Sequence, residues 1–280
     1  MSFEFRPAVS SDLPQAAALW NQVFGDPVPV VHSFWELFSA QPGFCAVAMN
    51  GDTMAAAAYC LDGLTLHLPE QPERACCYLY AVATAPEYRS HGLAAKLCVL
   101  LRDWAFQRGN DCLLTHPAEQ NLFPWYAAKV GAAPVMSCQL RAWDLSAQPS
   151  AVPVSILSPE EYVILREQLL TGSAHVTPPD TFFQWESLLH AAYGGAFLRV
   201  GDGIADVYAS QDTVEIQELL LSEKTERTVE SAAAAIGGYW NAAHCKAVLP
   251  GGEIPFISCA SQDGAPLVSV ETAWFGPVFG

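Results

Sequence analysis

The stretch that decides the fold of this 280-residue chain reads Val82-Ala83-Thr84-Ala85-Pro86-Glu87-Tyr88-Arg89-Ser90-His91-Gly92-Leu93-Ala94. The apolar run at residues 75–84 is typical of a central strand, and Pro86 ends it. From Gly92 to Gln107 the apolar side chains have helical spacing, so the sequence predicts a strand, a turn and a helix in succession. Such a turn presents backbone N–H groups at a helix N-terminus, where the helix dipole also favours an anion.

The side chains of this turn fit a phosphate-bearing ligand. Gly92 and Ala94 are small, so a bulky phosphate group can approach the backbone there. Arg89 adds a permanent positive charge. We therefore expect a pyrophosphate to bind at this turn.

The order Arg89-x-x-Gly92-x-Ala94 after a strand resembles the Gln/Arg-x-x-Gly-x-Gly/Ala signature of the GNAT superfamily of N-acetyltransferases. In that family the signature holds the pyrophosphate of acetyl-CoA, which implies contacts from Arg89, Ser90, His91, Gly92, Leu93 and Ala94. The resemblance also implies that the pantetheine arm of acetyl-CoA pairs like an added strand with Val82, Ala83 and Thr84. The strand is bulged in relatives, and an N–H near Val82 or Ala83 would polarise the thioester carbonyl.

A second match to the family lies at residues 123–132. It is similar to a helix ending in Tyr-x-x-Lys/Arg-x-Gly-Phe, with Ala132 in the place of the phenylalanine. In the family this tyrosine often protonates the departing CoA thiolate, which implies a catalytic Tyr126; a core aromatic is the alternative. A phenol of pKa about 10 can donate a proton at neutral pH without being ionised. Asn121 matches a position that often lies near pantetheine in relatives.

The general base is the open part of this mechanism. Relatives often use a glutamate on the central strand, but residues 78–84 contain no carboxylate. His116 and Glu119, acting directly or through water, are the candidates. Cys98 and Cys112 lie in apolar runs without an obvious histidine partner, so we do not expect covalent catalysis. A CoA-binding sensor or regulatory protein without turnover is therefore the alternative hypothesis.

The elements around the motif predict two copies of one fold. In the first half we expect strands at 3–6, 44–49, 54–61, 75–84, 111–116 and 135–144, and helices at 13–24, 32–38, 92–107 and 121–129. Proline and small residues at 146–155 indicate a linker. In the second half we expect helices at 158–170, 182–190 and 223–235, and strands at 196–200, 204–209, 214–221, 242–249 and 268–275. This order predicts an α/β (α+β) fold, duplicated and GNAT-like, in which helices flank a mixed, mostly antiparallel sheet.

The two copies differ in their motifs. Residues 1–145 form the expected acetyl-CoA-binding GNAT-like domain. Residues 146–280 contain no second copy of the signature, and the corresponding place reads Ser-Glu-Lys-Thr-Glu-Arg at 222–227. Without glycine, that segment is a poor pyrophosphate cradle. We interpret residues 146–280 as a degenerate GNAT-like domain that has lost its CoA site.

The charge of the chain limits its partners. With 13 basic and 29 acidic residues the net charge is −16, which excludes a typical nucleic-acid or anionic-membrane surface. The first 145 residues carry 8 basic and 13 acidic side chains, and the remainder carry 5 and 16. An acidic second half favours a cationic, amine-bearing acceptor.

The cysteines and the N-terminus indicate a cytoplasmic protein. Nine cysteines without a C-x-x-C pair predict buried thiols and no metal site. Residues 1–7 are not a signal peptide, and no run of about 18 apolar residues predicts a membrane helix. We expect an N-acetyltransferase that moves an acetyl group from acetyl-CoA to a small amine-bearing acceptor by direct attack in a ternary complex. It would be a monomer or a homodimer.

Overall fold

The structure is a computed structural model that describes residues 2–145, 151–222, 225–264, 273–276 and 278–279. The chain divides into two compact units. Unit 1 consists of Met1–Leu66, Pro72–Met136 and Pro255–Val270, and unit 2 consists of His67–Gln71, Ser137–Ile254 and Glu271–Gly280. This division differs from the expected boundary at residue 145, because a late strand of the chain belongs to unit 1 and most of strand β6 belongs to unit 2.

Unit 1 is built on a sheet with the strand order β1-β2-β3-β4-β5-β13. Its strands are β1 (Glu4–Pro7), β2 (Cys45–Asn50), β3 (Thr53–His67), β4 (Arg74–Thr84), β5 (Cys112–Thr115) and β13 (Ile254–Ser261). Neighbouring strands are antiparallel, except that β4 and β5 are parallel. The predicted hairpin is confirmed: β2 and β3 are joined at Gly51, whose φ of 60° is the left-handed conformation that an Asn-Gly turn requires.

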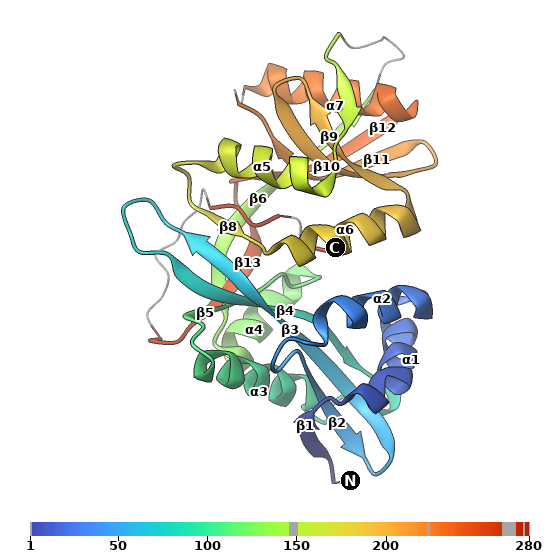
Figure 1. The fold of residues 1–280 in the computed structure, drawn as a ribbon, viewed down its shortest axis with the longest axis vertical. Coiled ribbons are helices and arrows are strands. Elements are labelled where there is room, and N and C mark those ends of the chain that lie inside the picture. The colour runs from blue at the N-terminus through green and yellow to red at the C-terminus, as the bar shows by residue number, and fades with distance from the viewer. Residues whose placement is uncertain (1, 146–150, 223–224, 265–272, 277, 280) are drawn as a thin grey trace. The chain divides into compact units, whose positions relative to one another are not determined.

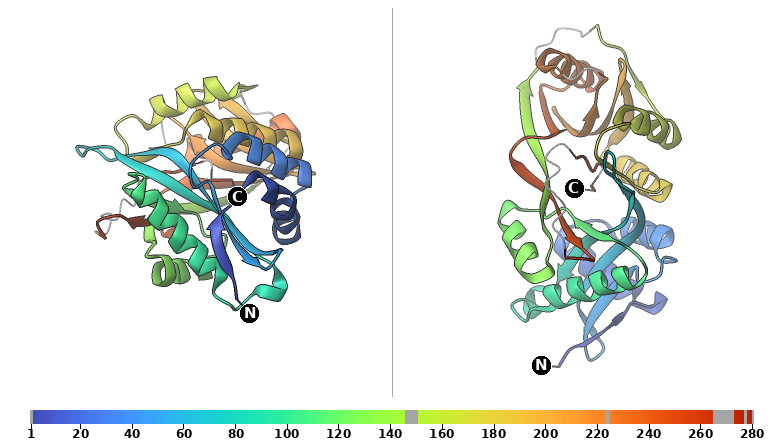
Figure 2. Two further views of the ribbon diagram at one scale, coloured as in Figure 1. Left: turned by 60° about the horizontal axis from the view of Figure 1, so that its bottom comes forward. Right: turned by 90° about the vertical axis from the view of Figure 1, so that its left-hand side faces the viewer.

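Two pairs of helices cover the two faces of this sheet (Figure 1 and Figure 2). They are α1 (Leu13–Phe24) and α2 (Val28–Phe38) on one face, and α3 (Leu93–Gln107) and α4 (Phe123–Val130) on the other. Short 3₁₀ turns occupy Ser10–Asp12, Pro86–Tyr88 and Gln120–Leu122. Aromatic rings fill the space under α1 and α2, where Trp20 and Phe34 both contact Tyr59 of β3. Helix α3 instead packs leucines against alanines of the strands. Both faces of the sheet are therefore covered.

The strands of unit 2 are arranged in the order β6-β12-β11-β10-β9-β7. Its strands are β6 (Ala133–Asp144), β7 (Val154–Ile156), β9 (Gly195–Val200), β10 (Gly203–Ser210), β11 (Thr213–Leu220) and β12 (His244–Pro250), and β8 (His175–Thr177) lies off this path. Only β11 and β12 are parallel among these pairs. The helices are α5 (Pro159–Leu170) and α6 (Asp180–Tyr193) on one face and α7 (Glu226–Trp240) on the other (Figure 1).

The two units repeat one order of elements. Each has a strand, two helices, three antiparallel strands, a helix and then a strand parallel to the third of those strands. Each also has one extra residue in that third strand: β4 between Tyr80 and Ala83, and β11 between Ile216 and Glu218. The predicted fold class, a duplicated and mostly antiparallel mixed sheet flanked by helices, is confirmed.

Some expected elements differ from the observed ones. Helix α2 begins at Val28 rather than His32, because Pro29 suits the first turn of a helix. The expected linker at 146–155 includes β7, and its residues 146–150 lie outside the described part of the chain. Most of the expected strand at 268–275 also lies outside it. Strand β13 was not predicted.

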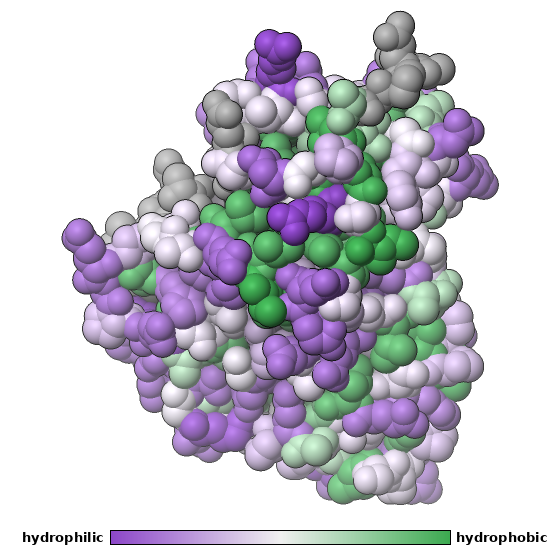
Figure 3. All heavy atoms as spheres, turned by 45° about the horizontal axis from the view of Figure 1, so that its top comes forward, coloured by the Kyte–Doolittle hydropathy of each residue, from purple (hydrophilic) through white to green (hydrophobic). Residues whose placement is uncertain are grey.

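On one face of the chain, hydrophilic and hydrophobic residues are interspersed (Figure 3). Among the described residues, no helix has both the length and the apolar character needed to cross a membrane.

Candidate active site

Strand β4 is irregular close to its C-terminal end. Ala57 of β3 lies opposite Ala83, whereas Tyr59 lies opposite Tyr80, so β4 carries one residue more than β3 over this stretch. Ala81 within the bulge has a φ of 45°, a conformation that a non-glycine residue rarely adopts. A bulge turns backbone groups out of the regular ladder. Val82 and Ala83, the expected oxyanion donors, follow directly.

The end of β4 also separates from β5. The two strands pair from Cys76–Cys112 to Leu79–Thr115, where β5 ends, while β4 continues to Thr84. On its other side β4 remains paired with β3, since Thr84 lies opposite Ala56. Among the described strands, β5 therefore leaves the edge of residues 80–84 unpaired, and that edge can accept an extended ligand as an added strand. Val82, Ala83 and Thr84 all lie on this stretch.

The turn after β4 leads into a helix whose N-terminus has free donors. Pro86–Tyr88 form a 3₁₀ turn, and Ser90 and Gly92 have φ values of 67° and 73°. Within the described chain no side chain caps α3, so the N–H groups of its first turn are available to a ligand. A Cβ at Gly92 would meet nothing within 4 Å, so the glycine serves the backbone conformation rather than a tight contact.

Basic and aromatic side chains surround this helix N-terminus. Arg89 is exposed, and it has no side-chain partner among the described residues. His91 is exposed as well, with its ring 5.6 Å from that of Phe3. One turn into α3, the Lys96 ammonium lies 5.4 Å from the centre of the Phe5 ring. The helix dipole, the uncapped N–H groups and Arg89 together give this end of the helix the donors and positive charge that an anion site needs.

Tyr126 of α4 lies where β4 and β5 separate. Its side chain is buried, and burial raises the pKa of the phenol above its ordinary value of 10, although an interaction with the Thr115 hydroxyl opposes the rise. Thr115 ends β5 and donates a hydrogen bond to the carbonyl of Leu79, the last residue of β4 that pairs with β5. The phenol is therefore protonated at neutral pH and able to donate. Sequence reasoning missed Thr115, whose signal is a polar residue that ends an apolar strand.

The two candidate bases lie just beyond β5. His116 is mostly buried, and its ring centre lies 4.7 Å from that of Phe256 in β13. Burial lowers the pKa of His116 to about 4, so its imidazole is neutral at pH 7. Glu119 is exposed, and its carboxylate accepts a hydrogen bond of 3.0 Å from the side-chain amide of Asn121. The structure thus brings Asn121 to Glu119.

The cysteines near this site are structural. Cys98 is fully buried in α3, and burial raises the pKa of its thiol to about 12. Cys112 is also fully buried, and it lies beside Cys76 across the paired strands β4 and β5. A buried thiol in apolar surroundings, such as that of Cys98, is a poor nucleophile.

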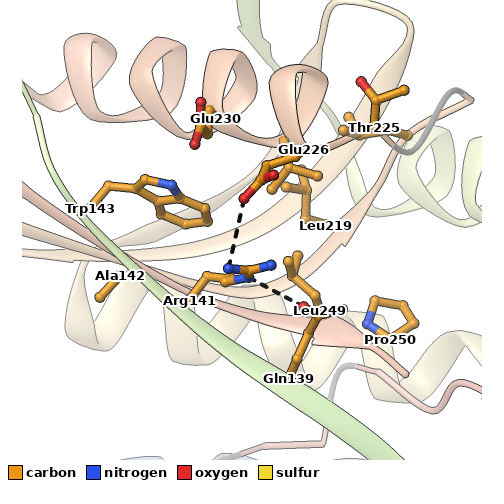
Figure 4. Close-up of a pocket in the computed structure, with 12 residues that line it drawn as sticks. Gln139, Arg141, Ala142, Trp143, Leu219, Thr225, Glu226, Glu230, Leu249 and Pro250 are labelled. Carbon is orange, nitrogen blue, oxygen red and sulfur yellow. Dashed lines mark hydrogen bonds and ion pairs between the residues drawn. The ribbon is translucent and has the colours of Figure 1, made fainter. Parts of the chain in front are cut away.

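The corresponding strand–helix junction of unit 2 is built differently. Thr225 caps α7 by accepting a hydrogen bond of 3.2 Å from the Thr228 N–H, so its side chain already satisfies one N–H of that helix end. A cavity of about 250 Å³ adjoins this end, and Glu226 and Glu230 point toward it (Figure 4). Arg141 of β6 reaches Glu226 at 4.0 Å across the cavity (Figure 4). Carboxylates at this position disfavour an anion.

Comparisons with known proteins agree with this geometry. Residues 4–124 match the family model described as an acetyltransferase (GNAT) domain. Among curated proteins, no sequence matches the chain. The chain is similar in fold to a GCN5-related N-acetyltransferase from Kribbella flavida, with a TM-score of 0.68 and 15% identity over 94% of this chain and 71% of that one.

Two further solved structures match over nearly their whole length. A GCN5-related N-acetyltransferase from Sphaerobacter thermophilus has a TM-score of 0.56 and 14% identity, over 96% of this chain and 98% of that one. A tandem GNAT protein from the clavulanic acid biosynthesis pathway has a TM-score of 0.56 and 13% identity, over 95% of this chain and 99% of that one. At such identities the likeness establishes the fold, and it includes the tandem arrangement.

Proposed function

We propose that this chain is an N-acetyltransferase of the tandem GNAT type, because its residues 4–124 match the acetyltransferase (GNAT) domain model and its fold is similar to that of a tandem GNAT protein. It transfers an acetyl group from acetyl-CoA to a small, amine-bearing acceptor by direct attack in a ternary complex. One observation carries this proposal: in unit 1 the unpaired edge of β4 leads directly to the uncapped N-terminus of α3. An acyl-CoA has matching parts, an extended pantetheine arm and a pyrophosphate.

Two parts of this feature bind the cofactor: the N-terminus of α3 and the unpaired edge of β4. The pyrophosphate accepts hydrogen bonds from the first-turn N–H groups of α3, beside Arg89, Ser90 and His91. Gly92, Leu93 and Ala94 bring the backbone close to it. The pantetheine amides pair with residues Val82–Thr84, and the thioester lies at the bulge of β4. Asn121 adds a polar contact on the β5 side.

Acetyl transfer then needs three groups of this chain. The amine nitrogen forms a bond to the thioester carbonyl carbon, and the resulting oxyanion accepts a hydrogen bond from the N–H of Val82 or Ala83. The C–S bond breaks, and the thiolate takes the phenolic proton of Tyr126. The amine gives up its own proton through water to His116 or Glu119. With a pKa of about 4 for His116, the acceptor must arrive largely as the neutral amine.

A second candidate function is a CoA-binding sensor without turnover. The observation that favours it is the composition of β4, Arg74–Thr84, which contains no carboxylate to act as a base. A sensor needs the anion site of α3 but not the proton donor. The two hypotheses therefore share the cofactor site and differ in the role of Tyr126.

Acetyl-CoA titrated into the whole chain by calorimetry tests the cofactor site. We expect saturable binding that Gly92→Glu weakens by more than about 100-fold, because a carboxylate there repels the pyrophosphate. Gly109→Glu is the matched control, since Gly109 also has a positive φ, 96°, and open space for a Cβ, at the other end of α3. Equal binding by both variants would remove the cofactor assignment.

A thiol-release screen separates the enzyme from the sensor. Acetyl-CoA and the chain are mixed with polyamines, aminoglycosides, amino acids and peptides in turn, and free CoA is measured. Release that depends on one acceptor class supports the acetyltransferase and names its substrate. Tight acetyl-CoA binding without release in any class supports the sensor.

A further inference from the structure

Two histidines and a glutamate from separate parts of the sequence meet in unit 2. His67 ends β3, Glu167 lies in α5, and His175 begins β8. One ring nitrogen of each histidine and one carboxylate oxygen of Glu167 all lie within 4.8 Å of one another. The His67 and His175 rings are stacked, with centres 4.7 Å apart and planes 19° from parallel.

A backbone hydrogen bond fixes the proton on His175. Its Nδ1 lies 2.8 Å from the carbonyl oxygen of Ser173, which can only accept, so Nδ1 carries a hydrogen and donates it. The other nitrogen, Nε2, faces a carboxylate oxygen of Glu167 at 3.2 Å. An imidazole lone pair and a carboxylate repel each other, so a hydrogen or a metal ion must lie between these two atoms.

The carboxylate of Glu167 is itself held in place. Its Oε2 accepts a hydrogen bond of 2.7 Å from the Thr177 hydroxyl, and its Oε1 accepts one of 2.8 Å from Arg166. The carboxylate is thus oriented by hydrogen bonds on both oxygens. Metal-binding carboxylates and histidines are typically oriented by such outer hydrogen bonds.

We propose that His67, Glu167 and His175 bind a zinc ion. Two imidazole nitrogens and one carboxylate oxygen are a ligand set that Zn²⁺ accepts, with water in the fourth position. The Glu167 side chain is 32% exposed, so an ion can reach it from solvent, whereas the His175 side chain is only 8% exposed and is held in place.

The bound ion would tie His67 to α5 and β8, which follow about 100 residues later in the chain. All three segments belong to unit 2. Strand β8 is short: the Val176 N–H donates a hydrogen bond of 2.9 Å to the Trp274 carbonyl, and the Trp274 N–H donates one of 3.1 Å to the Ala174 carbonyl. Zinc therefore adds a structural link, independent of acyl transfer.

Metal titration of the whole, folded chain tests this site. After treatment with a chelator and dialysis, calorimetry with zinc chloride should show one equivalent bound, and magnesium chloride should show none. Cobalt chloride should give the visible absorption bands of a four-coordinate Co²⁺ site. His67→Asn and Glu167→Gln should each weaken zinc binding at least tenfold, while His244→Asn, which removes an exposed histidine paired with Asp144, should not.

A second, more conservative pair of variants tests the site in case the substitutions of the ligands themselves unfold the protein. Thr177→Val removes only the hydroxyl that holds Glu167 and should weaken zinc binding by about 10- to 100-fold. Thr171→Val is its control, because the Thr171 hydroxyl bonds only the backbone carbonyl of Glu167. Absence of zinc binding, or equal affinity in Thr177→Val, Thr171→Val and the unmodified chain, would overturn the proposal.

Discussion

At the scale of single residues, Tyr126 distinguishes an enzyme from a binding protein. Burial keeps its phenol protonated beside Thr115, at the place where β4 and β5 part. A proton donor is useful only if a thiolate forms there. Loss of this proton donor should therefore lower the turnover rate, which a variant of Tyr126 can measure.

We predict that Tyr126→Phe lowers kcat by about 10²- to 10⁴-fold, the usual contribution of a general acid. The KM for acetyl-CoA should change little, because the ring remains in the core and only the proton is lost. Steady-state kinetics with the acceptor from the screen measures both constants. Tyr239→Phe, at an exposed position in α7, is the control.

A buried acid in unit 2 makes stability depend on pH. Glu186 is 1% exposed, and burial together with the charge of Asp206 raises its pKa to about 8. It accepts a hydrogen bond of 2.5 Å from Tyr208, and His190 Nε2 lies 2.7 Å from Asp206. At neutral pH the folded state therefore holds a proton on Glu186 that the unfolded chain releases.

We predict that the free energy of unfolding falls as pH rises from about 4.5 to about 8. The stabilising contribution of protonated Glu186 is complete below the unfolded pKa and is lost as pH passes the folded one. The proton on Glu186 contributes a slope of at most about 1.4 kcal/mol per pH unit. Burial also raises the pKa of Asp206, which adds to the slope in the same direction. Denaturant unfolding at several pH values should show this slope, and Glu186→Gln should flatten it.

Whether a feature of the site could be predicted depends on how close together its residues lie along the sequence. The turn at Arg89 and Gly92 could be predicted, because a strand, a turn and a helix are encoded there in consecutive residues. The environment of His116 could not, since Phe256 lies 140 positions later and no periodicity links them. The proposed zinc ligands His67, Glu167 and His175 share no regular spacing either, so the sequence led us to expect no metal.

At the scale of elements, the helices differ most at their N-terminal ends. Helix α3 begins without a side-chain cap at Gly92, whereas Ser158 and Thr225 cap α5 and α7. A side-chain cap stabilises a helix N-terminus, whereas an uncapped N-terminus leaves its backbone N–H groups available to a ligand. The two helices at corresponding positions, α3 and α7, are thus suited to ligand binding and to stability respectively.

We predict that Thr225→Ala lowers the free energy of unfolding by about 1 kcal/mol, because an N–H of α7 loses its partner. Thr225→Gly should cost less, since water can then reach the helix end. Urea denaturation of the three chains measures both values. Acetyl-CoA affinity should be the same in all three, and a change in it would place unit 2 in the cofactor site.

The helices and strands themselves were largely predictable from apolar periodicity, but their pairing was not. The bulge in β4 was expected only through the family resemblance, because an extra residue is visible only against the register of β3. Strand β13 contains Pro255 and follows two glycines, so local signals favoured a loop there. Tertiary pairing with β5 overrides those signals.

At the scale of the whole molecule, the two repeats exchange strands. Strand β13, at the end of the second repeat, pairs with β5 of the first, and β6 pairs with β12 of the second. The duplication could be predicted from repeated element order. The exchange could not, because it concerns which sheet a strand joins and leaves no local pattern.

We predict that a fragment of residues 1–145 does not fold alone. Without β13, an edge of the fully buried strand β5 would be unpaired, and such an edge promotes aggregation. Size-exclusion chromatography and thermal melting should show aggregates without a cooperative transition. Co-expression with residues 146–280 should restore a folded complex, and a monomeric, folded fragment would contradict the prediction.

The position of β13 also bears on how such a gene can change over time. The second repeat lacks the glycine turn for which we propose cofactor binding. Yet deleting that repeat would remove a strand from the sheet that carries the turn. Mutation can therefore remove binding residues from the second repeat, but the sheet of the first repeat still needs strand β13 from it.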